Sequence, residues 1–426
     1  MKINVIGGGL AGSEAASFLA REGYEVHLYD MKPRLGEAFH SPKFGELVCS
    51  NSLKSESKEN ACGLLKFEME KLGSLMMEAT KVSRIPSGQD LAVDRELFSS
   101  YIDDKIRENK NIIVHSEEVI ALEEGDEVIN IICTGPLTSS KFCSYLKDKY
   151  LGDLMSFFDA AAPLVYFSSL DTSKMYYKSR YDKGEGKYLN IPLSKEEYLS
   201  FVEDLRNAER VELHDFDHFE GCLPIEVMAS RDLDTLRFGP LKAKGLEQEG
   251  NRPYAVIQLR QDDVNGSLYN LVGFQTNLTF KEQKRVLQKI KGLENVKFAR
   301  FGLMHRNSYI NAPSLINRDL SLKKNRNIFV AGQFSGVEGY VESAATGLLA
   351  SYYVKQRIEG KEFEPIPLNT MLGSLVNYLV MSSPKHFAPM NATYGILQLP
   401  FKKDKLTIYE ESLEGITKWL ESQITK

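Results

Sequence analysis

An apolar run, a glycine-rich turn and a helical segment open the chain and constrain its fold more than any other feature. Residues 2–6 (KINVI) have the composition of a buried strand, and residues 7–12 (GGGLAG) follow directly. Residues 13–20 continue as a helix, and a second strand, 25–29, ends at the acidic Asp30. A bare G-x-G-x-x-G is weak evidence, but strand, turn, helix, strand and acid in this order form the dinucleotide-binding fingerprint. The opening therefore predicts a Rossmann-like α/β domain.

Each part of this turn has a physical role. Gly7 permits the tight turn, Gly9 lets the backbone approach a pyrophosphate, and Gly12 lets the helix pack closely on the strand. The pyrophosphate would lie at the helix N-terminus, where free N–H groups and the helix dipole favour an anion. The acid would accept a hydrogen bond from a ribose hydroxyl. The turn alone does not separate FAD from NAD, but its N-terminal position in a chain of this length favours FAD. The predicted cofactor-binding residues here are Gly7, Gly8, Gly9, Leu10, Ala11, Gly12 and Asp30.

The overall composition is that of a water-soluble protein with two or three domains. The chain has 426 residues, of which 42% are hydrophobic and 26% charged. No apolar run approaches the ~18 residues that a membrane span needs, and the glycine turn begins too early for a signal peptide. We therefore expect a cytoplasmic protein without a membrane partner. The net charge of −5 provides no general attraction to DNA or RNA, so an RNA substrate would need a local basic face.

Five cysteines show neither paired spacing nor a zinc pattern, so no disulfide framework and no metal site is predicted. Cys49 precedes small polar residues typical of a loop or a helix start, where nearby N–H groups can lower a thiol pKa. Cys62 lies on the apolar side of a helix expected to run to Leu75, which favours a core position. Cys222 follows Gly221 on an irregular segment. For Cys222 the residues alone favour a packing role over catalysis, because most single cysteines are inert.

A second nucleotide-fold region returns about 300 residues later. The strand 128–132 closes at a Cys-Thr-Gly-Pro turn containing Gly135. The strand 327–331 leads into the glycine-rich loop 332–340, and 341–350 forms the next helix. A second strand, glycine loop and helix could hold the flavin end of FAD. The cofactor-binding residues predicted in this region are Gly135, Gly332, Gly336 and Gly347.

The middle of the chain differs in composition and indicates an inserted α+β domain. We expect a first FAD-binding part at 1–160, an inserted substrate or RNA domain at 161–315, and the second FAD-binding part with a C-terminal cap at 316–426. Within the insertion, 254–260 and 270–276 have strand patterns. Residues 281–291 form a helix rich in Lys and Arg, for which a solvated surface is favoured over RNA contact on charge alone.

Several longer sequence stretches, taken together, resemble one family over nearly the whole chain. They are GGGLAGSEAA (7–16), ELVCSNSL (46–53), LAVDR (91–95), FEGCLPIEVMA (219–229), LRFGP (236–240), MHRN (304–307) and GVEGYVESAATGL (336–348). In this order the sequence resembles the folate- and FAD-dependent tRNA (uracil-5-)-methyltransferases, the TrmFO family. The related GidA-type enzymes share the glycine loops but not the two cysteine-containing stretches.

The resemblance implies FAD as cofactor, with 5,10-methylenetetrahydrofolate and NADPH or NADH as co-substrates. The implied product is 5-methyluridine in the T-loop of tRNA, and a ribosomal RNA uridine is the alternative target. It further implies that Cys222 attacks the uracil ring, because C5 is a poor nucleophile until a thiolate adds to C6. Cys49 would be a second active-site thiol, whose role as base, shield or alternative nucleophile stays open. Arg237, His305 and Arg306 are implied to contact phosphate or folate or to transfer protons.

Two other classes of function remain possible from the sequence. A plain FAD oxidoreductase would turn over without RNA and would keep its activity after Cys222→Ala. A non-catalytic RNA-binding flavoprotein would bind RNA but form no methylated uridine. The two cysteine-containing stretches argue against both.

Overall fold

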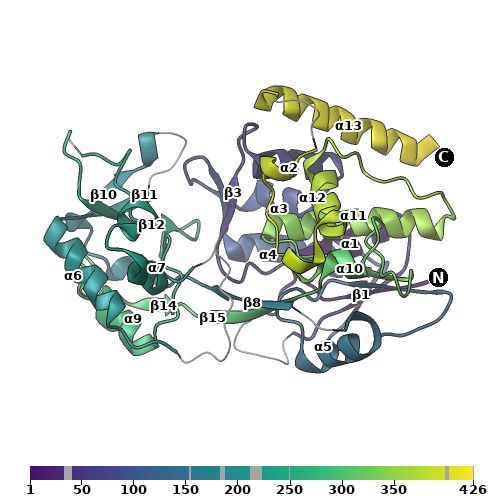
Figure 1. Cartoon of the computed structure of the whole chain (residues 1–426), viewed down its shortest axis with the longest axis horizontal. Helices are drawn as coiled ribbons and strands as arrows, with labels where there is room; N and C mark the ends of the chain where they lie inside the picture. Colours follow the sequence, from purple (N-terminus) through teal and green to yellow (C-terminus); the bar gives the residue numbers. More distant parts are fainter. Residues whose placement is uncertain are drawn as a thin grey trace.

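The computed structural model shows two lobes of unequal size, joined by a two-stranded ribbon (Figure 1). It describes residues 1–32, 41–152, 155–182, 188–211, 223–248, 250–398 and 403–425. The ribbon pairs β8 (Met155–Ala160) with β15 (Met304–Tyr309) in antiparallel register. The larger lobe contains both chain termini.

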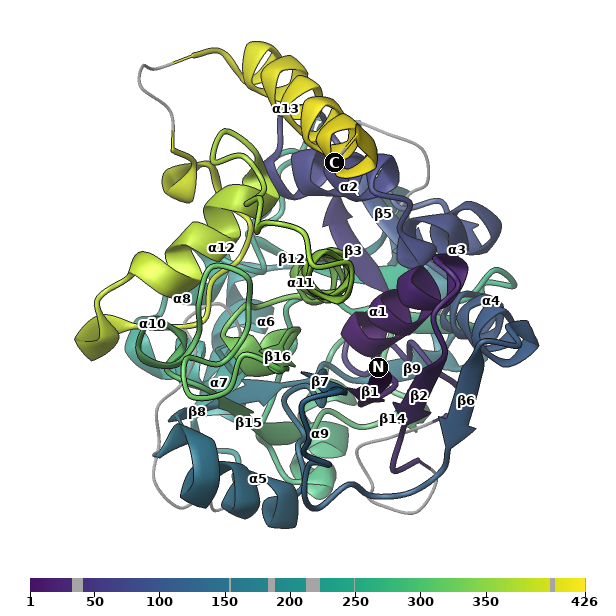
Figure 2. The same cartoon turned by 90° about the vertical axis from the view of Figure 1, so that its right-hand side faces the viewer.

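The larger lobe is built on a five-stranded parallel sheet, seen from its end in Figure 2. Its order is β16-β7-β1-β2-β6, so the first strand of the chain lies at the centre. Helices α1 (Leu10–Arg21) and α11 (Tyr340–Ile358) follow the two glycine turns and pack against each other. The strands are β1 (Lys2–Ile6), β2 (Val26–Tyr29), β6 (Ile112–His115), β7 (Val128–Ile132) and β16 (Ile328–Val330). The predicted Rossmann-like α/β fold is confirmed.

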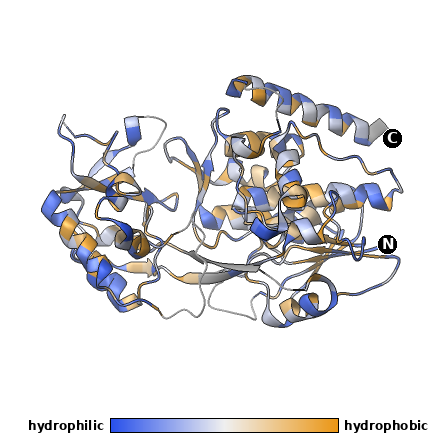
Figure 3. Ribbon diagram, in the orientation of Figure 1, coloured by the Kyte–Doolittle hydropathy of each residue, from blue (hydrophilic) through white to orange (hydrophobic). Residues whose placement is uncertain are grey.

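The smaller lobe is a six-stranded sheet with helices on one face. Its order is β10-β11-β12-β13-β9-β14, and every neighbouring pair is antiparallel. Helices α6 and α9 show both hydrophilic and hydrophobic residues in Figure 3, as helices with one buried face do. The strands are β9 (Leu164–Tyr166), β10 (Tyr176–Lys178), β11 (Tyr188–Leu193), β12 (Ala255–Gln261), β13 (Leu268–Leu271) and β14 (Phe298–Arg300). The helices are α6 (Lys195–Arg206), α7 (Ile225–Arg231), α8 (Thr235–Phe238) and α9 (Phe280–Leu287).

This second sheet uses residues 164–300 only, which lie inside the segment expected to be inserted. The two strands of the ribbon enclose it in the sequence, one on each side. The domain boundaries at 160/161 and 315/316 themselves stay a prediction.

The remaining elements surround the parallel sheet. A three-stranded sheet, β3-β5-β4, and the helices α2, α3 and α4 lie between β2 and β6 in the sequence. The bounds are β3 (Ser52–Ser55), β4 (Arg84–Ile85), β5 (Asp90–Val93), α2 (Ala61–Lys71), α3 (Leu75–Ser83), α4 (Arg95–Glu108), α5 (Ser140–Leu146), α10 (Ala312–Leu315), α12 (Met371–Met381) and α13 (Lys405–Thr425). Short 3-10 or π turns are η1 (Lys147–Leu151), η2 (Phe167–Ser169), η3 (Thr172–Lys174), η4 (Arg180–Asp182), η6 (Gln333–Ser335), η7 (Pro384–His386) and η8 (Tyr394–Ile396).

One predicted helix, 281–291, ends earlier in the structure, at Leu287, and two further predicted elements are interrupted by a turn. The helix through Cys62 does not continue to Leu75, because Gly73 adopts a positive φ of 74° and a new helix, α3, begins there. The strand expected at 270–276 ends at Leu271, where the chain turns. In both places a turn interrupts an apolar stretch that periodicity alone reads as continuous. Cys62 itself is buried, as predicted.

None of the helices among the described residues is long and apolar enough to cross a membrane.

Candidate dinucleotide and thiol site

Two glycines of the first turn leave no room for a larger residue. A Cβ on Gly7, whose φ is +106°, would lie 2.4 Å from the carbonyl oxygen of Cys133. A Cβ on Gly12 would lie 1.8 Å from the carbonyl oxygen of Gly7. By contrast, a Cβ on Gly9 would meet no atom within 4 Å, so the backbone there faces open space. The turn is thus closed on its protein side and open where a pyrophosphate would approach.

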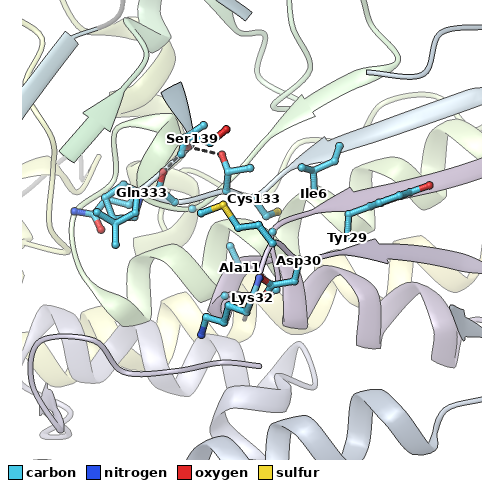
Figure 4. Close-up of a pocket in the computed structure, with 18 of the residues that line it drawn as sticks. Ile6, Ala11, Tyr29, Asp30, Lys32, Cys133, Ser139 and Gln333 are labelled. Atoms are coloured by element: carbon cyan, nitrogen blue, oxygen red, sulfur yellow. Dashed lines mark hydrogen bonds between the residues drawn. The ribbon is translucent and has the colours of Figure 1, made fainter. Parts of the chain in front are cut away.

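The open side faces a cavity of about 1040 Å³, its mouth included. Figure 4 shows part of the wall, with Ser139 and Gln333 on one side, Ile6 and Tyr29 on the other, and Cys133 between them. The lining residues include Gly7, Gly8, Gly9, Leu10, Ala11, Asp30, Lys32, Glu46, Val48, Glu117, Glu118, Val119, Thr134, Gly135, Thr138, Ser139, Gly332, Gln333, Tyr340 and Ser343. Segments from both halves of the nucleotide fold therefore form one cavity.

Asp30 lies at the end of β2, on the cavity wall. It is 9% exposed, and its Oδ1 accepts a hydrogen bond of 2.9 Å from the backbone N–H of Lys32. Burial raises the pKa of this carboxyl, while the Lys32 N–H and the Lys32 charge oppose the shift. Lys32 in turn forms a 2.6 Å ion pair with Glu46. Asp30 thus keeps an acceptor beside the cavity, as a ribose contact requires.

The other predicted glycines divide into two groups. Gly135 and Gly332 line the cavity. Gly12, Gly336 and Gly347 do not line it, and a Cβ on any of them would collide with protein. On Gly336 it would lie 2.5 Å from the Phe387 ring, and on Gly347 it would lie 2.2 Å from the Ala11 carbonyl oxygen. These three glycines therefore allow close packing within the protein.

The turn after β7 contributes hydroxyl groups that the sequence analysis did not single out. The Thr134 and Thr138 hydroxyls lie 2.6 Å apart, and Thr138 donates to the carbonyl oxygen of Gly135 over 2.8 Å. Ser139 caps α5 by accepting the N–H of Phe142. Hydroxyl residues grouped after a Thr-Gly turn were the available signal in the sequence.

Cys49 lies behind the cavity wall, against Tyr340. The Tyr340 hydroxyl donates to Cys49 Sγ over 3.0 Å and accepts the Cys49 N–H over 2.7 Å. It also accepts the N–H of Ser50 over 3.2 Å. Burial, followed by the negative charge of an ionised Cys49, raises the pKa of Tyr340 well above its ordinary value. Because Tyr340 and Val48 both line the cavity, Cys49 is one side chain removed from it.

Arginine side chains hold the backbone around Cys49. Arg95 donates to the carbonyl oxygen of Leu47 over 2.6 Å and to that of Cys49 over 3.1 Å. Its charge is balanced by Asp262 of the smaller lobe, at 2.8 Å. Burial opposes the charged form of Arg95, but Asp262 leaves its pKa raised, with smaller contributions from Tyr340 and Cys49. Residues 47–51, the cysteine segment, are thus held in place by charged groups from both lobes.

The remaining predicted site residues are not assembled by the described part of the structure. Cys222 lies outside the described residues, and so do the side chains of His305 and Arg306 on β15. Arg237 stacks on Tyr254 with its guanidinium carbon 4.2 Å from the ring centre, and its Nε donates to the Tyr254 carbonyl oxygen over 3.3 Å. Arg237 therefore has structural partners in the smaller lobe.

The residues present fit an FAD-type dinucleotide. The open backbone at Gly9 lies at the N-terminus of α1, which suits a pyrophosphate. Asp30 suits a ribose, and the second glycine loop at Gly332 with the start of α11 suits the far end of a long cofactor. No group of three His, Cys, Asp or Glu side chains able to hold a metal ion occurs within the described ranges.

Comparison with known proteins agrees with this geometry. The model of the family described as "Glucose inhibited division protein A" matches residues 2–362. The solved structure of GidA from Aquifex aeolicus superposes with a TM-score of 0.76 at 17% identity, covering 99% of this chain and 73% of that one. This likeness confirms the fold predicted as GidA-related.

Curated relatives are much closer in sequence. A protein of Bacillus subtilis (strain 168) is 49% identical over 407 residues, or 94% of this chain and 93% of the relative. One from Lactobacillus delbrueckii subsp. bulgaricus is 49% identical over 402 residues, or 93% and 91%. Both carry the name "Methylenetetrahydrofolate--tRNA-(uracil-5-)-methyltransferase TrmFO". The chain therefore belongs to the glucose inhibited division protein A family and, within it, to the TrmFO group.

Proposed function

We propose that this chain forms 5-methyluridine in tRNA, with methylenetetrahydrofolate as carbon donor and FAD, reduced by NADPH or NADH, as electron donor. The names of relatives 49% identical over most of the chain specify the folate, the tRNA and the uracil C5 position. The structural observation that carries the proposal is the position of Cys49, one hydrogen bond from a side chain that lines the dinucleotide cavity. We further propose that the protein acts in the cytoplasm.

The chemistry explains why a thiol is needed beside this cavity. A thiolate that adds to uracil C6 moves electron density to C5, and C5 can then bond to the one-carbon unit. Loss of the C5 proton then expels tetrahydrofolate and leaves an exocyclic methylene group on C5. Addition of a hydride to this methylene group gives the methyl group, expels the sulfur and restores the ring. Reduced FAD, when bound, would supply that hydride.

We assign the attack on C6 to Cys222 and a second role in the same site to Cys49. Support for Cys222 comes from the family-like stretch 219–229, in which it stands. Support for Cys49 comes from its contact with Tyr340 and from the guanidinium group of Arg95 on its carbonyl oxygen. Cys49 is suited to accept the C5 proton, to shield the reactive centre or to act as an alternative nucleophile.

The proposed target is the T-loop uridine of tRNA. A ribosomal RNA uridine, modified by the same chemistry, is the second target to test. A decisive assay supplies labelled methylenetetrahydrofolate and NADPH to the purified holoenzyme, with separate tRNA and ribosomal RNA pools, and maps 5-methyluridine by mass spectrometry. We expect label in the tRNA T-loop.

The cysteine assignments are tested in the same assay. Cys222→Ala should abolish methyl transfer, and Cys49→Ala should reduce it strongly. Cys143→Ala, a change at another partly exposed cysteine, is the control and should retain activity. Methyl transfer that required S-adenosylmethionine, or flavin turnover on small molecules with no RNA methylation, would contradict the proposal.

A further inference from the structure

Four side chains form one row across the sheet of the smaller lobe. Arg260 on β12 lies opposite Asn270 on β13, and Asn270 lies opposite Leu164 on β9. Leu164 is opposite Arg300 on β14. Directly opposed residues of antiparallel strands point to the same face of a sheet. The register of β14 shifts at a bulge between Phe298 and Arg300, so the pairing alone does not orient Arg300. The hydrogen bonds of Arg260 and Arg300 nevertheless both reach the cysteine segment of the larger lobe.

Arg300 forms hydrogen bonds with the backbone at Cys49. Its Nη1 donates to the carbonyl oxygen of Val48 over 2.9 Å, and its Nη2 donates to that of Cys49 over 3.1 Å. The charge of Arg95 on the same carbonyl is paired with Asp262. Arg300 differs, because no carboxylate of the described residues lies within 4.0 Å of its guanidinium group, and its buried Nε has no hydrogen-bond partner. Among the described residues, Arg300 thus brings a positive charge that no carboxylate contacts directly, and Asp262 acts on it only from beyond 4.0 Å.

Arg260 fixes the next two residues of the same segment. Its Nη2 donates to the Ser50 hydroxyl over 2.8 Å, and its Nε donates to Asn51 Oδ1 over 3.2 Å. Asn51 donates back to the carbonyl oxygen of Gln261 over 3.2 Å. Arg260 is 8% exposed and Asn51 is fully buried, so water competes little for these contacts. The sheet of the smaller lobe therefore holds residues 48–51 one after another.

We propose that Arg300, supported by Arg260, is a positioning residue through which the smaller lobe holds Cys49 against Tyr340 and stabilises its thiolate. A positive charge close to a cysteine favours the ionised, nucleophilic form. The hydrogen bonds to the carbonyl oxygens set where the side chain of Cys49 can point. This inference rests on the proposed role of Cys49 in methyl transfer, but it can be tested without RNA.

The charged and titratable groups around Cys49 come from several elements. Arg95 begins α4, Asp262 follows β12 and forms its ion pair, and Tyr340 begins α11. Arg260 on β12 and Arg300 on β14 approach from the smaller lobe. Because Asp262 forms its ion pair with Arg95, a change at Arg300 alters the net charge at the segment and leaves that ion pair intact.

The test measures the alkylation rate of Cys49 in the flavin-loaded protein. Iodoacetamide is applied from pH 6 to pH 9.5, and the peptide containing Cys49 is quantified by mass spectrometry. We compare wild type with Arg300→Met, Arg300→Lys and the control Arg206→Met, which removes an arginine bound to the Ala229 carbonyl oxygen elsewhere in the smaller lobe.

In Arg300→Met we expect the midpoint of the alkylation profile to move up by about one pH unit, with a roughly tenfold slower rate at pH 7. Arg300→Lys, which keeps the charge, should reverse most of this shift and leave the midpoint close to that of wild type. Arg206→Met should match wild type. Arg260→Met, which spares both contacts to the Cys49 carbonyl oxygen, should give a smaller shift and serves if Arg300→Met does not fold.

An unchanged midpoint in a folded, flavin-loaded Arg300→Met protein would overturn the proposal, even if the protein were less stable. The proposal also fails if Arg300→Lys and Arg300→Met behave alike. If the shift is found but no RNA is methylated by wild type, the proposed function fails and the positioning role stands. The two conclusions are therefore separable.

Discussion

The glycine turn at residues 7–12 and the cysteine segment at 47–51 lie at the same cavity but are held in opposite ways. The turn is fixed by backbone atoms that approach where side chains are missing. The cysteine segment is fixed by long side chains, above all Arg95, Arg300 and Tyr340. The turn shapes a cavity for a cofactor that stays bound. In the proposed function, the segment holds a thiol whose position and ionisation affect methyl transfer.

The two kinds of support have different consequences for mutation. A backbone contact tolerates no added atom, so its failure is complete and independent of pH. A side-chain contact can be removed one hydrogen bond at a time, so the effects of mutation are graded. Such mutations should change the reactivity of the thiol before they unfold the protein. Substitutions in the two regions should therefore differ in kind as well as in size.

The largest effect on function, complete loss of flavin binding, is expected at Gly12. In Gly12→Ala the new methyl group would overlap the Gly7 carbonyl oxygen, which forces the turn to move. Overpacking of this kind costs about 1–3 kcal/mol or more, and displacement of the turn should abolish flavin binding. Flavin absorbance per protein and urea unfolding measure both effects.

Gly9→Ala is the matched control for Gly12→Ala. The added methyl group meets no protein atom, so the stability of the cofactor-free protein should match wild type. Flavin affinity alone should fall, since the methyl group enters the space left for the cofactor. If the Gly12→Ala protein kept its flavin, the turn would tolerate an added atom, contrary to the difference argued between the two regions.

Removing Arg95 should cost more stability than removing any exposed arginine. Arg95→Met leaves Asp262, whose side chain is 2% exposed, without its partner. Breaking one side of a buried ion pair costs about 3–5 kcal/mol. The exposed pair of Arg84 with Glu56 is the control, and Arg84→Met should change the free energy of unfolding by about 1 kcal/mol or less. Equal losses in urea unfolding would show that the lobes are not joined through Arg95.

The sequence predicted the glycine-turn side of this comparison well. The strand expected at residues 2–6 has those bounds in the structure, and the helix that follows the turn is present. This part was predictable because strand, turn and helix are adjacent in the chain, and each local preference agrees with the final fold. The packing environment of Gly336 and Gly347 was not predictable, because the contacts of a glycine depend on a distant segment.

The cysteine side was predictable only in part. The small polar residues after Cys49 predicted a loop or a helix start, and the structure has a bend there. Its partners Arg95, Arg300 and Tyr340 are 46, 251 and 291 residues away along the chain. No periodicity or spacing links residues so far apart, and an arginine on a strand gives no sign of which carbonyl oxygen it will bind.

Tyr340→Phe should give a moderate effect that separates chemistry from fold. Loss of the hydroxyl leaves the N–H groups of Cys49 and Ser50 without their acceptor, at a cost of about 2 kcal/mol. It also removes the donor to Cys49 Sγ, so alkylation of Cys49 should need higher pH and methyl transfer should fall. Tyr352→Phe, which loses one bond to the Leu72 carbonyl oxygen, is the control and should leave the alkylation profile unchanged. An unaltered profile in Tyr340→Phe would mean that the hydroxyl only supports the backbone.

The smallest effect concerns two buried carboxyls that each join two helices of the larger lobe. Glu14 on α1 accepts the N–H groups that begin α3, and Glu68 on α2 accepts those that begin α12. Burial, only partly opposed by these hydrogen bonds, raises the pKa of each carboxyl to about 7. A carboxyl that holds its proton more tightly when folded stabilises the protein below its unfolded pKa, and this contribution disappears as pH rises through about 7.

Urea unfolding at pH 5.5 and pH 7.5 measures this contribution. Between these values Glu68→Gln should lose about 1–2 kcal/mol of the gain that wild type shows on acidification. Glu70→Gln, an exposed change on the same helix, should keep that gain. If Glu68→Gln kept the full pH dependence, the carboxylate would be ionised in the fold and stabilised by the start of α12. The stability of the larger lobe would then depend on a charged side chain, as the position of the cysteine segment does. Support by backbone contacts alone would be limited to the glycine turn.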